Sequence, residues 1–319
     1  MWGMEKSSAQ EKTKQNQALE QDIQSFAQKI EQFLFEVNQL ILDKPQQTKL
    51  ALTCLLAGGH VLFEDLPGLG KTTLASALAR LAGLHFQRIQ FTNDMLASDV
   101  IGINIFNQKE HLFEFKQGPI FTQILLADEI NRCSPKTQSA LLEAMEEGAV
   151  TVDGVHYELP QPFWVLATQN PLFQSGTYAL PESQLDRFLM RLSLGYPSRQ
   201  AEKLLLQQRS RQVLIHQLEA VFNQADILHL RELAKQVFLS EAVLNYILDL
   251  AAETRKLRHG LSTRGVLALK AAAQAYALVE GRSFVMTDDI QTVFVAVVAH
   301  RLSLSDVEVG QILQSVDVL

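Results

Sequence analysis

The chain contains few of the residues that build disulfide scaffolds, zinc sites or membrane spans. Its 319 residues include two cysteines and eight histidines, and the histidines show none of the short paired spacings of zinc ligands. We therefore expect no disulfide framework, no Cys/His metal site and a reducing compartment. The longest apolar run near the end, residues 293–299, is far shorter than the roughly 20 residues that span a bilayer, and the polar start has no apolar signal segment. We expect no membrane span and a cytoplasmic location.

The chain also lacks an excess of basic residues. It has 28 Lys and Arg against 35 Asp and Glu, which gives a formal net charge of -7. Proteins that bind nucleic acid usually show a basic excess or a basic face, so we expect no nucleic-acid partner. Hydrophobic residues make up 47% of the chain, which is enough for a large core, and the length favours two domains over one.

The order of apolar runs predicts an α/β domain followed by a helical domain. Residues 1–20 are polar, and we expect them to be disordered. In residues 21–197 short apolar runs alternate with helical patterns, which indicates a mostly parallel five-stranded sheet in a three-layer αβα arrangement. The five expected strands are residues 61–64, 86–91, 124–128, 163–168 and 190–194. Residues 198–319 contain helical patterns alone and predict a smaller all-α domain.

Local signals predict several helix ends and one buried stripe. Ser134 and Pro135 are typical of a helix start, and Gly148 is placed to end the same helix. Another helix is expected to begin at Ser262 or Thr263. In the helical domain an apolar stripe recurs at helical spacing and predicts one buried face, formed by Leu244, Ile247, Leu248 and Ala251.

The most informative segment is residues 64–73, which follows an apolar run and precedes a helical pattern. Strand, glycine loop, Lys-Thr and helix in this order are the layout of a phosphate-binding loop. Backbone N–H groups and the positive end of the helix can hold a triphosphate, while Lys71 can reach the outer phosphates and the Thr72 hydroxyl can bind Mg²⁺. The strict pattern has Gly where this chain has Asp65. The residues expected to bind ATP here are Pro67, Gly68, Leu69, Gly70, Lys71, Thr72 and Thr73.

A dinucleotide-binding loop is the competing interpretation of these glycines. Residues 68–73 nearly match the pattern G-x-G-x-x-G but lack its last glycine. They also contain a lysine that a pyrophosphate site of that kind does not need. We therefore favour ATP with Mg²⁺ over a nicotinamide or flavin cofactor.

Two carboxylates, Asp128 and Glu129, stand at the end of the expected strand at residues 124–128. In an open parallel sheet, ligands bind beyond the carboxyl ends of the strands, so both side chains should face the same crevice as the glycine loop. Asp128 would hold Mg²⁺ together with Thr72. Glu129 would orient or deprotonate the water that attacks the γ-phosphate. Such a pair alone can be a solvated strand end, but the Lys-Thr loop upstream favours the metal site.

Further polar residues lie at the ends of the later strands. Asn170 could hydrogen-bond the γ-phosphate or the attacking water, although an Asn-Pro pair such as Asn170-Pro171 is also common in turns. Arg187 and Arg191 could stabilise the charge of a transferring phosphoryl group. The alternative for each arginine is a surface salt bridge.

Together these segments resemble the MoxR family of AAA+ ATPases, in the helix-2-insert branch. The resemblance covers the chain from about residue 25 to the C-terminal helices. It rests on the Lys-Thr loop and on LLADEINR (125–132), SPKTQSALLEAMEE (134–147), VLATQNP (165–171) and LPESQLDRFL (180–189). It implies a Walker A motif at Gly68, Gly70, Lys71 and Thr72, a Walker B motif at Asp128 and Glu129, and sensor 1 at Asn170.

The resemblance also implies roles for two arginines. Arg187 would be an arginine finger supplied to the nucleotide of the neighbouring subunit, with Arg191 as the second candidate. Residues 261–265 resemble the sensor 2 segment, which implies that Arg264 closes the helical lid onto the bound phosphates. Asp43 stands where such proteins often have a glycine beside the adenine pocket.

Two segments fit inserted β-hairpins of this branch. Residues 102–118 contain three phenylalanines and fit the hairpin in helix 2, and residues 150–159 fit a second hairpin that turns at Asp153-Gly154. The phenylalanines could touch a client protein or could pack the insertion on its own domain.

The family resemblance implies an ATPase that remodels or matures partner proteins, among them proteins with a von Willebrand factor A domain. It implies ATP and Mg²⁺ as cofactors and a ring, a homo-hexamer, with active sites between subunits. A nucleotide-binding switch without remodelling is the first alternative, and the set of Asp128, Glu129, Asn170 and Arg187 disfavours it. A nucleic-acid-acting AAA+ motor is the second alternative, and the acidic charge balance disfavours it.

Overall fold

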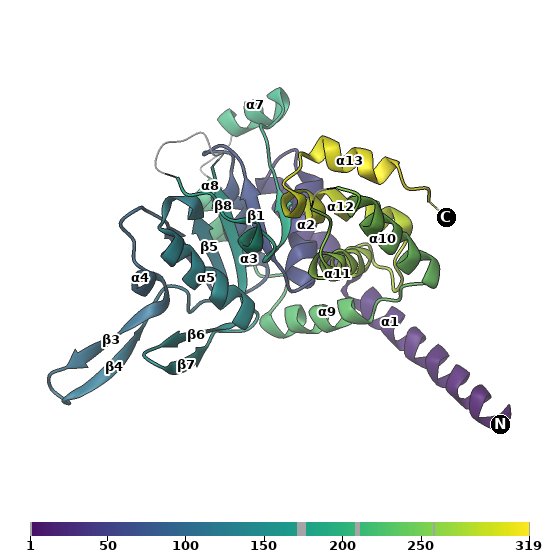
Figure 1. Cartoon of the computed structure of the whole chain (residues 1–319), viewed down its shortest axis with the longest axis horizontal. Helices are drawn as coiled ribbons and strands as arrows, with labels where there is room; N and C mark the ends of the chain where they lie inside the picture. Colours follow the sequence, from purple (N-terminus) through teal and green to yellow (C-terminus); the bar gives the residue numbers. More distant parts are fainter. Residues whose placement is uncertain (1, 171–176, 208–210, 258, 319) are drawn as a thin grey trace.

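The computed structural model describes residues 2–170, 177–207, 211–257 and 259–318. Its centre is a five-stranded parallel sheet in the order β2-β5-β8-β1-β9 (Figure 1). In chain order the strands are β1 (His60–Glu64), β2 (Phe86–Gln90), β5 (Ile124–Asp128), β8 (Trp164–Gln169) and β9 (Phe188–Leu192). The predicted α/β class, the parallel sheet and all five strands are confirmed, with bounds that differ by at most two residues.

Helices cover both faces of this sheet. Because successive strand side chains point to opposite faces, Ile124 and Leu126 enter one hydrophobic core, whereas Leu125 and Ala127 enter the other. The first core contains residues of α1 (Trp2–Leu40), α2 (Pro45–Leu56) and α3 (Lys71–Leu81). The second core contains residues of α4 (Ala97–Ile101) and α5 (Pro135–Glu147). The sheet is thus the middle of three layers.

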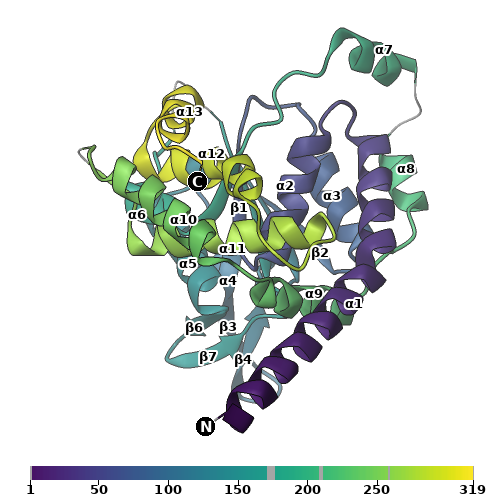
Figure 2. The same cartoon turned by 90° about the vertical axis from the view of Figure 1, so that its right-hand side faces the viewer.

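The C-terminal helices form a lid that packs on the sheet edge. α11 contacts α2, and α12 contacts the edge strand β9, so that the first core continues into the lid as far as Val309. Figure 2 shows this group of helices beside α2. It consists of α9 (Gln224–Gln236), α10 (Glu241–Thr254), α11 (Thr263–Val279), α12 (Thr287–Leu302) and α13 (Asp306–Gln314).

The segment between sheet and lid does not belong wholly to the lid. α7 (Arg199–Gln207) stands away from the body in both views (Figures 1 and 2), while α8 (Arg211–Gln217) packs against α3. The backbone N–H groups of Val221 and Phe222 then bond to the carbonyl of Leu81. The residues after the predicted boundary at 197/198 therefore pack on the α/β domain again, through α8 and residues 221–222, before the lid begins at α9.

The predicted helix ends are confirmed. α5 starts at Pro135 after Ser134, whose Oγ accepts the N–H of Thr137 at 3.3 Å. It ends before Gly148, which has a φ of 64° and so adopts the left-handed conformation that favours glycine. α11 begins at Thr263, and Ser262 caps it.

The start of the chain differs from the expectation. α1 runs back to Trp2, through the polar stretch 1–20 for which we expected disorder. Residues 4–40 contain neither Pro nor Gly to end a helix, and they are rich in the good helix formers Gln, Glu, Lys and Ala. Leu19, near the end of this stretch, is buried and joins the first core.

The buried stripe predicted on α10 was partly wrong. Ile247 and Ala251 are buried as expected, but Leu244 and Leu248 are 40% and 54% exposed. Apolar residues occur on more than one side of this helix, so the helical period alone does not choose the buried face. The side chains that take the remaining buried positions are Val243, Tyr246, Leu250 and Thr254.

Both predicted hairpins are confirmed, and they project side by side at the lower left of Figure 1. One consists of β3 (Gly102–Asn107) and β4 (Leu112–Gln117), the other of β6 (Ala149–Val152) and β7 (Val155–Glu158). The second turns at Asp153 and Gly154, both with positive φ. Asn104 Nδ2 donates to Asp153 Oδ2 at 2.7 Å, which joins the two hairpins.

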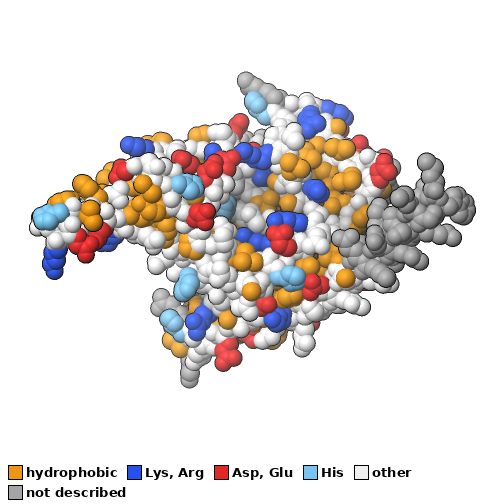
Figure 3. All heavy atoms as spheres, turned by 90° about the horizontal axis from the view of Figure 1, so that it is seen from below, with side chains coloured by type: hydrophobic (Ala, Val, Ile, Leu, Met, Phe, Trp, Pro, Cys, Tyr) orange, Lys and Arg blue, Asp and Glu red, His pale blue; other side chains and the backbone are white. Residues whose placement is uncertain are grey.

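The three phenylalanines of the first hairpin do not share one role. Phe115 stacks on Tyr157 of the second hairpin, with 4.0 Å between ring centroids. Phe106 and Phe113 pair across the strands and are 47% and 72% exposed. Figure 3 shows hydrophobic side chains gathered along this hairpin at the left end of the molecule. Packing on the domain therefore accounts for Phe115 and leaves Phe106 and Phe113 open to solvent.

No helix in the described part of the chain is long and apolar enough to cross a membrane.

Candidate functional site

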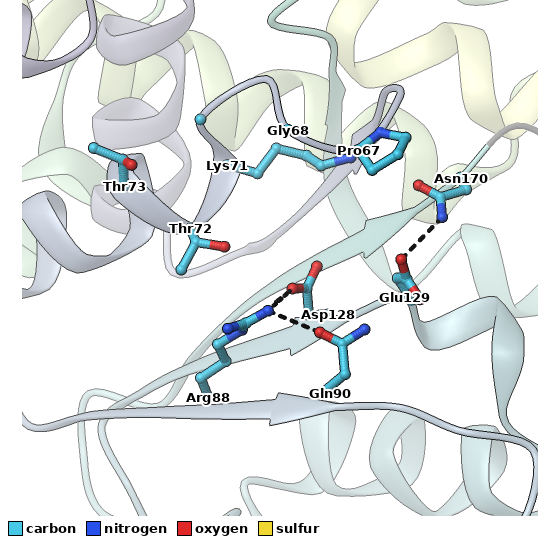
Figure 4. Close-up of a pocket in the computed structure, with 11 residues that line it drawn as sticks. Pro67, Gly68, Lys71, Thr72, Thr73, Arg88, Gln90, Asp128, Glu129 and Asn170 are labelled. Atoms are coloured by element: carbon cyan, nitrogen blue, oxygen red, sulfur yellow. Dashed lines mark hydrogen bonds and ion pairs between the residues drawn. The ribbon is translucent and has the colours of Figure 1, made fainter. Parts of the chain in front are cut away.

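A cavity of about 360 Å³ lies where the glycine loop meets the carboxyl ends of β5 and β8 (Figure 4). It brings together the predicted loop residues other than Leu69, the two predicted carboxylates and Asn170. It also includes two β2 residues that the sequence did not single out, Arg88 and Gln90. The complete lining is Pro67, Gly68, Gly70, Lys71, Thr72, Thr73, Arg88, Gln90, Asp128, Glu129 and Asn170.

The glycine loop has the shape of an anion cradle. Gly68 and Gly70 have φ values of 84° and 93°, which a residue with a Cβ rarely adopts. Gly70 directly precedes α3, so the free N–H groups of the first helical turn and the positive end of the helix dipole lie at the cavity. A phosphate group fits this arrangement.

Lys71 is held inside the loop by neutral groups. Its side chain is largely buried, and Nζ donates to the carbonyl oxygens of Asp65 at 2.7 Å and of Leu66 at 3.3 Å. Burial lowers the pKa of Lys71 below its usual value, while the charges of Asp65, Asp128 and Glu129 act in the opposite direction. Because a charged phosphate oxygen is a stronger acceptor than a carbonyl oxygen, the ammonium group can exchange these partners for a nucleotide.

Asp65 has a structural role that explains its departure from the strict loop pattern. Its carboxylate is buried and accepts three hydrogen bonds, from Ser193 Oγ at 2.7 Å, Leu194 N–H at 2.7 Å and Gly195 N–H at 3.1 Å. These three residues follow β9 and lead out of the sheet. Asp65 thus ties the base of the loop to the segment that leads away from the sheet.

Asp128 ends β5 with both carboxylate oxygens engaged. Thr168 Oγ1 donates to Oδ1 at 2.6 Å. Arg88 donates to Oδ2 from Nη2 at 2.7 Å and from Nε at 3.2 Å, and its Nη2 also donates to Gln90 Oε1 at 2.8 Å (Figure 4). Thr168 and Arg88 therefore orient the carboxylate that the sequence assigned to Mg²⁺.

The residues present fit a Mg²⁺ ion bound together with a nucleotide. Asp128 and the Thr72 hydroxyl line one cavity and supply the hard oxygen ligands that Mg²⁺ prefers. Among the described residues, no group of three or more His, Cys, Asp or Glu side chains could hold a metal ion. The remaining ligands would therefore be phosphate oxygens and water, which is usual for Mg²⁺ at phosphate sites.

Glu129 is held in an uncommon backbone conformation. Its φ and ψ are 56° and 48°, a left-handed conformation that costs a residue with a side chain roughly 1–3 kcal/mol. Its N–H donates to Thr168 Oγ1 at 2.9 Å. Asn170 Nδ2 donates to its Oε1 at 3.1 Å, and Arg132 Nε lies 3.0 Å from its Oε2. The surroundings thus fix the carboxylate at the mouth of the cavity.

Asn170 lies at the cavity, as predicted, and a neighbour positions it. Asn170 is buried and directly follows β8. The side chain of Asn131, also buried, donates to the carbonyl of Asn170 at 3.1 Å. Asn131 was not among the predicted site residues, although it lies in the segment LLADEINR, two residues after Glu129. Pro171, the other half of the Asn-Pro pair, lies outside the described residues.

Arg187 and Arg264 lie together, away from this cavity. Arg187 Nη1 donates to the carbonyl of Leu142 at 2.9 Å and the guanidinium pairs with Glu146. Arg264 Nη2 donates to Glu146 Oε1 at 2.9 Å. Both arginines line a separate cavity of about 350 Å³, and no described residue lines both cavities. The structure therefore does not place Arg264 over the chain's own phosphate loop, because α11 begins beside the end of α5.

Arg191, the second candidate for the finger, is engaged within the chain. Its Nη1 lies 3.2 Å from Glu64 Oε2 and its Nη2 lies 2.6 Å from Asp306 Oδ1. Gln169 Nε2 donates to the other oxygen of Glu64 at 3.0 Å. Arg191 thus bridges the end of β1 and the lid helix α13.

Asp43 adopts a φ of 64°, which explains why a glycine suits this position. Its Oδ2 accepts the N–H of Ser198 at 3.2 Å, so the side chain binds the segment that precedes α7. Ile41 is buried in the first core.

Comparisons with known proteins agree with this site. Residues 60–190 match the model of the "ATPase family associated with various cellular activities (AAA)", and residues 250–316 match that of the AAA lid domain. The chain is 39% identical over 288 residues to Chaperone MoxR1 of Mycobacterium tuberculosis, which covers 86% of this chain and 76% of that protein. The chain belongs to the MoxR family of AAA+ ATPases. The resemblance drawn from the motifs is confirmed.

Two other relatives match this MoxR-family chain over most of its length. The protein YeaC of Bacillus subtilis is 48% identical over 271 residues, which cover 84% of this chain and 85% of YeaC. A crystal structure of a protein assigned as an ATPase, from Cytophaga hutchinsonii, superposes with a TM-score of 0.85 at 34% identity. The superposition covers 97% of this chain and 99% of the other, so lid and sheet domain recur together in that relative.

Proposed function

We propose that this MoxR-family protein hydrolyses ATP in the cavity at Lys71 and uses the energy to remodel or mature partner proteins. The observation that carries the proposal is the convergence of three kinds of group on one cavity. The loop with Lys71 binds phosphates, Asp128 with Thr72 suits a divalent cation, and Glu129 suits the attacking water. These groups come from separate elements of the fold. Polar residues that only stand at a solvated strand end would have no reason to meet in one cavity.

Each residue has a part in the proposed reaction. Lys71 binds the outer phosphates, and the N–H groups at the start of α3 bind the remaining phosphate groups of the nucleotide. Mg²⁺ bound through Thr72 and Asp128 would neutralise phosphate charge. Glu129 accepts a proton from, or orients, the water that attacks the γ-phosphate, and Asn170 keeps the Glu129 carboxylate in place.

The two arginines outside the cavity support a ring. Arg187 and Arg264 share Glu146 as a partner and lie outside the cavity that we assign to the chain's own nucleotide. In our proposal both meet the nucleotide of a neighbouring subunit, with Arg187 as the finger and Arg264 beside it. A head-to-tail contact of this kind closes into a ring, and we propose a homo-hexamer.

Proteins are the proposed clients. One relative is named a chaperone, and we extend to this chain the family expectation of clients with a von Willebrand factor A domain. The exposed pair Phe106 and Phe113 is the proposed client contact, because neither ring is covered by its own domain. A cytoplasmic location is part of the same proposal, supported by the buried free thiols of Cys54 and Cys133.

Two alternatives give different results in simple assays. A nucleotide switch without turnover would bind ATP and release no phosphate. A nucleic-acid motor would bind DNA or RNA in a salt-dependent way, which the net charge of -7 does not favour.

The test of the proposal is the ATPase rate per subunit measured over protein concentrations from nanomolar to micromolar. A finger supplied by a neighbour requires assembly, so the rate per subunit should rise with concentration. A rate that stays flat would contradict the ring, and the absence of phosphate release at every concentration would favour the switch. Pull-down with Glu129→Gln in ATP should retain a client protein, whereas the same bait without nucleotide should not.

A further inference from the structure

Arg88 is the one cationic side chain other than Lys71 among the residues that line the nucleotide cavity. It lies on β2, which pairs in parallel with β5 so that Gln90 stands opposite Asp128. From there the guanidinium reaches forward to Asp128 and makes two hydrogen bonds to the same oxygen, Oδ2. Figure 4 shows the side chain rising from β2 into the space below Thr72 and the loop.

This contact occupies the carboxylate that the proposed function reserves for a cation. Thr168 takes Oδ1 of Asp128 and Arg88 takes Oδ2. A divalent cation, or a water bound to it, therefore meets a guanidinium already in place at Oδ2. The guanidinium and the divalent cation both bind the carboxylate of Asp128, so the binding of either one weakens the binding of the other.

The two partners differ in how firmly they are fixed. The Asp128 side chain is 13% exposed, whereas that of Arg88 is 47% exposed. Asp128 is thus a fixed acceptor, and Arg88 is a long side chain whose head can move without unpacking the core. A guanidinium also has the fork geometry that suits phosphate oxygens.

We propose that Arg88 and a divalent cation compete for Asp128 Oδ2, and that the displaced guanidinium binds the triphosphate. Arg88 would thereby be a second phosphate-binding cation of the site, in addition to Lys71. It would also neutralise Asp128 whenever no divalent cation is bound. This inference rests on the proposed function only in that ATP binds in this cavity.

Equilibrium binding of a fluorescent ATP analogue, with excess Mg²⁺ and separately with EDTA, tests the inference without any turnover. Arg88→Ala should weaken binding in EDTA by about tenfold, because Asp128 then has no cation to neutralise it and repels the nucleotide. With Mg²⁺ it should weaken binding by only about twofold, because the cation neutralises Asp128 and the variant lacks only the displaced guanidinium as a phosphate partner. The ratio of affinities with and without Mg²⁺ should therefore grow about fivefold. Arg88→Lys, which keeps the charge, should fall between the two.

Lys136→Ala is the charge control. Lys136 is an exposed residue of α5 and does not line the cavity. Its removal takes away one positive charge and should leave the ratio of affinities unchanged.

Three results would overturn the inference. An unchanged ratio in Arg88→Ala would show that the two cations do not compete. An Arg88→Ala variant with tighter binding in Mg²⁺ would show that the guanidinium does not hold phosphate. An equal change of this ratio in Lys136→Ala would show that the effect comes from the net charge of the protein and not from Arg88 at Asp128. If the wild-type chain bound no analogue in either condition, the proposed function itself would fail.

Discussion

Asp65 Oδ2 accepts the backbone N–H of Leu194 at 2.7 Å, across 129 positions of the chain. Asp65 is 6% exposed as a residue, and its carboxylate also accepts hydrogen bonds from Ser193 and Gly195. The backbone carbonyl of the same residue accepts a hydrogen bond from Lys71 Nζ. Asp65 therefore binds Lys71 through its main-chain carbonyl and binds residues 193–195, which follow β9, through its side chain. In this way it connects the phosphate-binding loop to the segment that leads from the sheet toward the lid.

Asp65→Ala should destabilise the fold. It removes a buried charged acceptor and leaves the N–H of Leu194 buried without a partner, which together cost about 3 kcal/mol. Urea denaturation followed by circular dichroism measures the change. Asp43→Gly is the control, because Asp43 binds the same connecting segment at Ser198 from an exposed position and already has a left-handed backbone that glycine tolerates. A loss in Asp65→Ala no greater than in this control would contradict the role given to Asp65.

Glu129→Gln should bind ATP normally and lose turnover by about 100-fold or more, because the amide cannot accept the proton of the attacking water. Binding of a fluorescent ATP analogue and release of phosphate measure the two effects separately. Glu147→Gln, on the exposed side of α5, is a control that should change neither. Turnover at the wild-type rate in Glu129→Gln would remove Glu129 from the reaction.

Stability should fall as the pH drops from 6.5 toward 4, in part through His60. This buried side chain accepts the N–H of Val165 at Nδ1 and donates from Nε2 to the carbonyl of Met145. Burial, assisted by the charge of Arg231, lowers the pKa of His60 from 6.5 to about 4. The unfolded chain therefore binds a proton below pH 6.5 that the folded chain does not bind. This difference lowers the free energy of unfolding by roughly 3 kcal/mol between pH 6.5 and 4.

His60→Gln isolates this contribution, since Gln keeps one acceptor and one donor and does not titrate. The free energy of unfolding of the wild type should fall more steeply than that of the variant between pH 6.5 and 4. His300, whose pKa burial also lowers, contributes in the same direction to both proteins. Parallel pH profiles of wild type and variant would show that His60 is not the cause.

The strands, the glycine loop and the carboxylate pair could be predicted because their signals are local. Gly68 and Gly70 are required by their own backbone conformation, and Asp128 follows directly on the apolar run that forms β5. The helix cap at Ser134 is local in the same way. The motif order alone therefore identified most of the cavity lining.

The contacts that the sequence did not reveal join residues far apart in the chain. Arg88 meets Asp128 only because β2 and β5 pair in a particular register. The partners of Asp65 lie beyond β9, and Arg264 reaches Glu146 because α11 starts beside α5. None of these pairings has a spacing that a single sequence displays, so their discovery required the packed fold.

In the proposed ring, one chain supplies the phosphate loop and its neighbour supplies Arg187. Mixing two inactive variants shows whether the two groups act across subunits. Lys71→Ala lacks the loop lysine and Arg187→Ala lacks the finger, so each alone should be a poor ATPase. In a 1:1 mixture about a quarter of the contacts would combine an intact loop with an intact finger, if subunits assort at random around the ring. Arg191→Ala is the comparison variant, because Arg191 is paired with Glu64 and Asp306 within its own chain.

We expect the mixture of Lys71→Ala and Arg187→Ala to recover about a quarter of the wild-type ATPase rate per subunit, and neither variant to do so alone. A mixture as inactive as its two components, or an Arg187→Ala protein that hydrolyses ATP at the wild-type rate, would contradict the account.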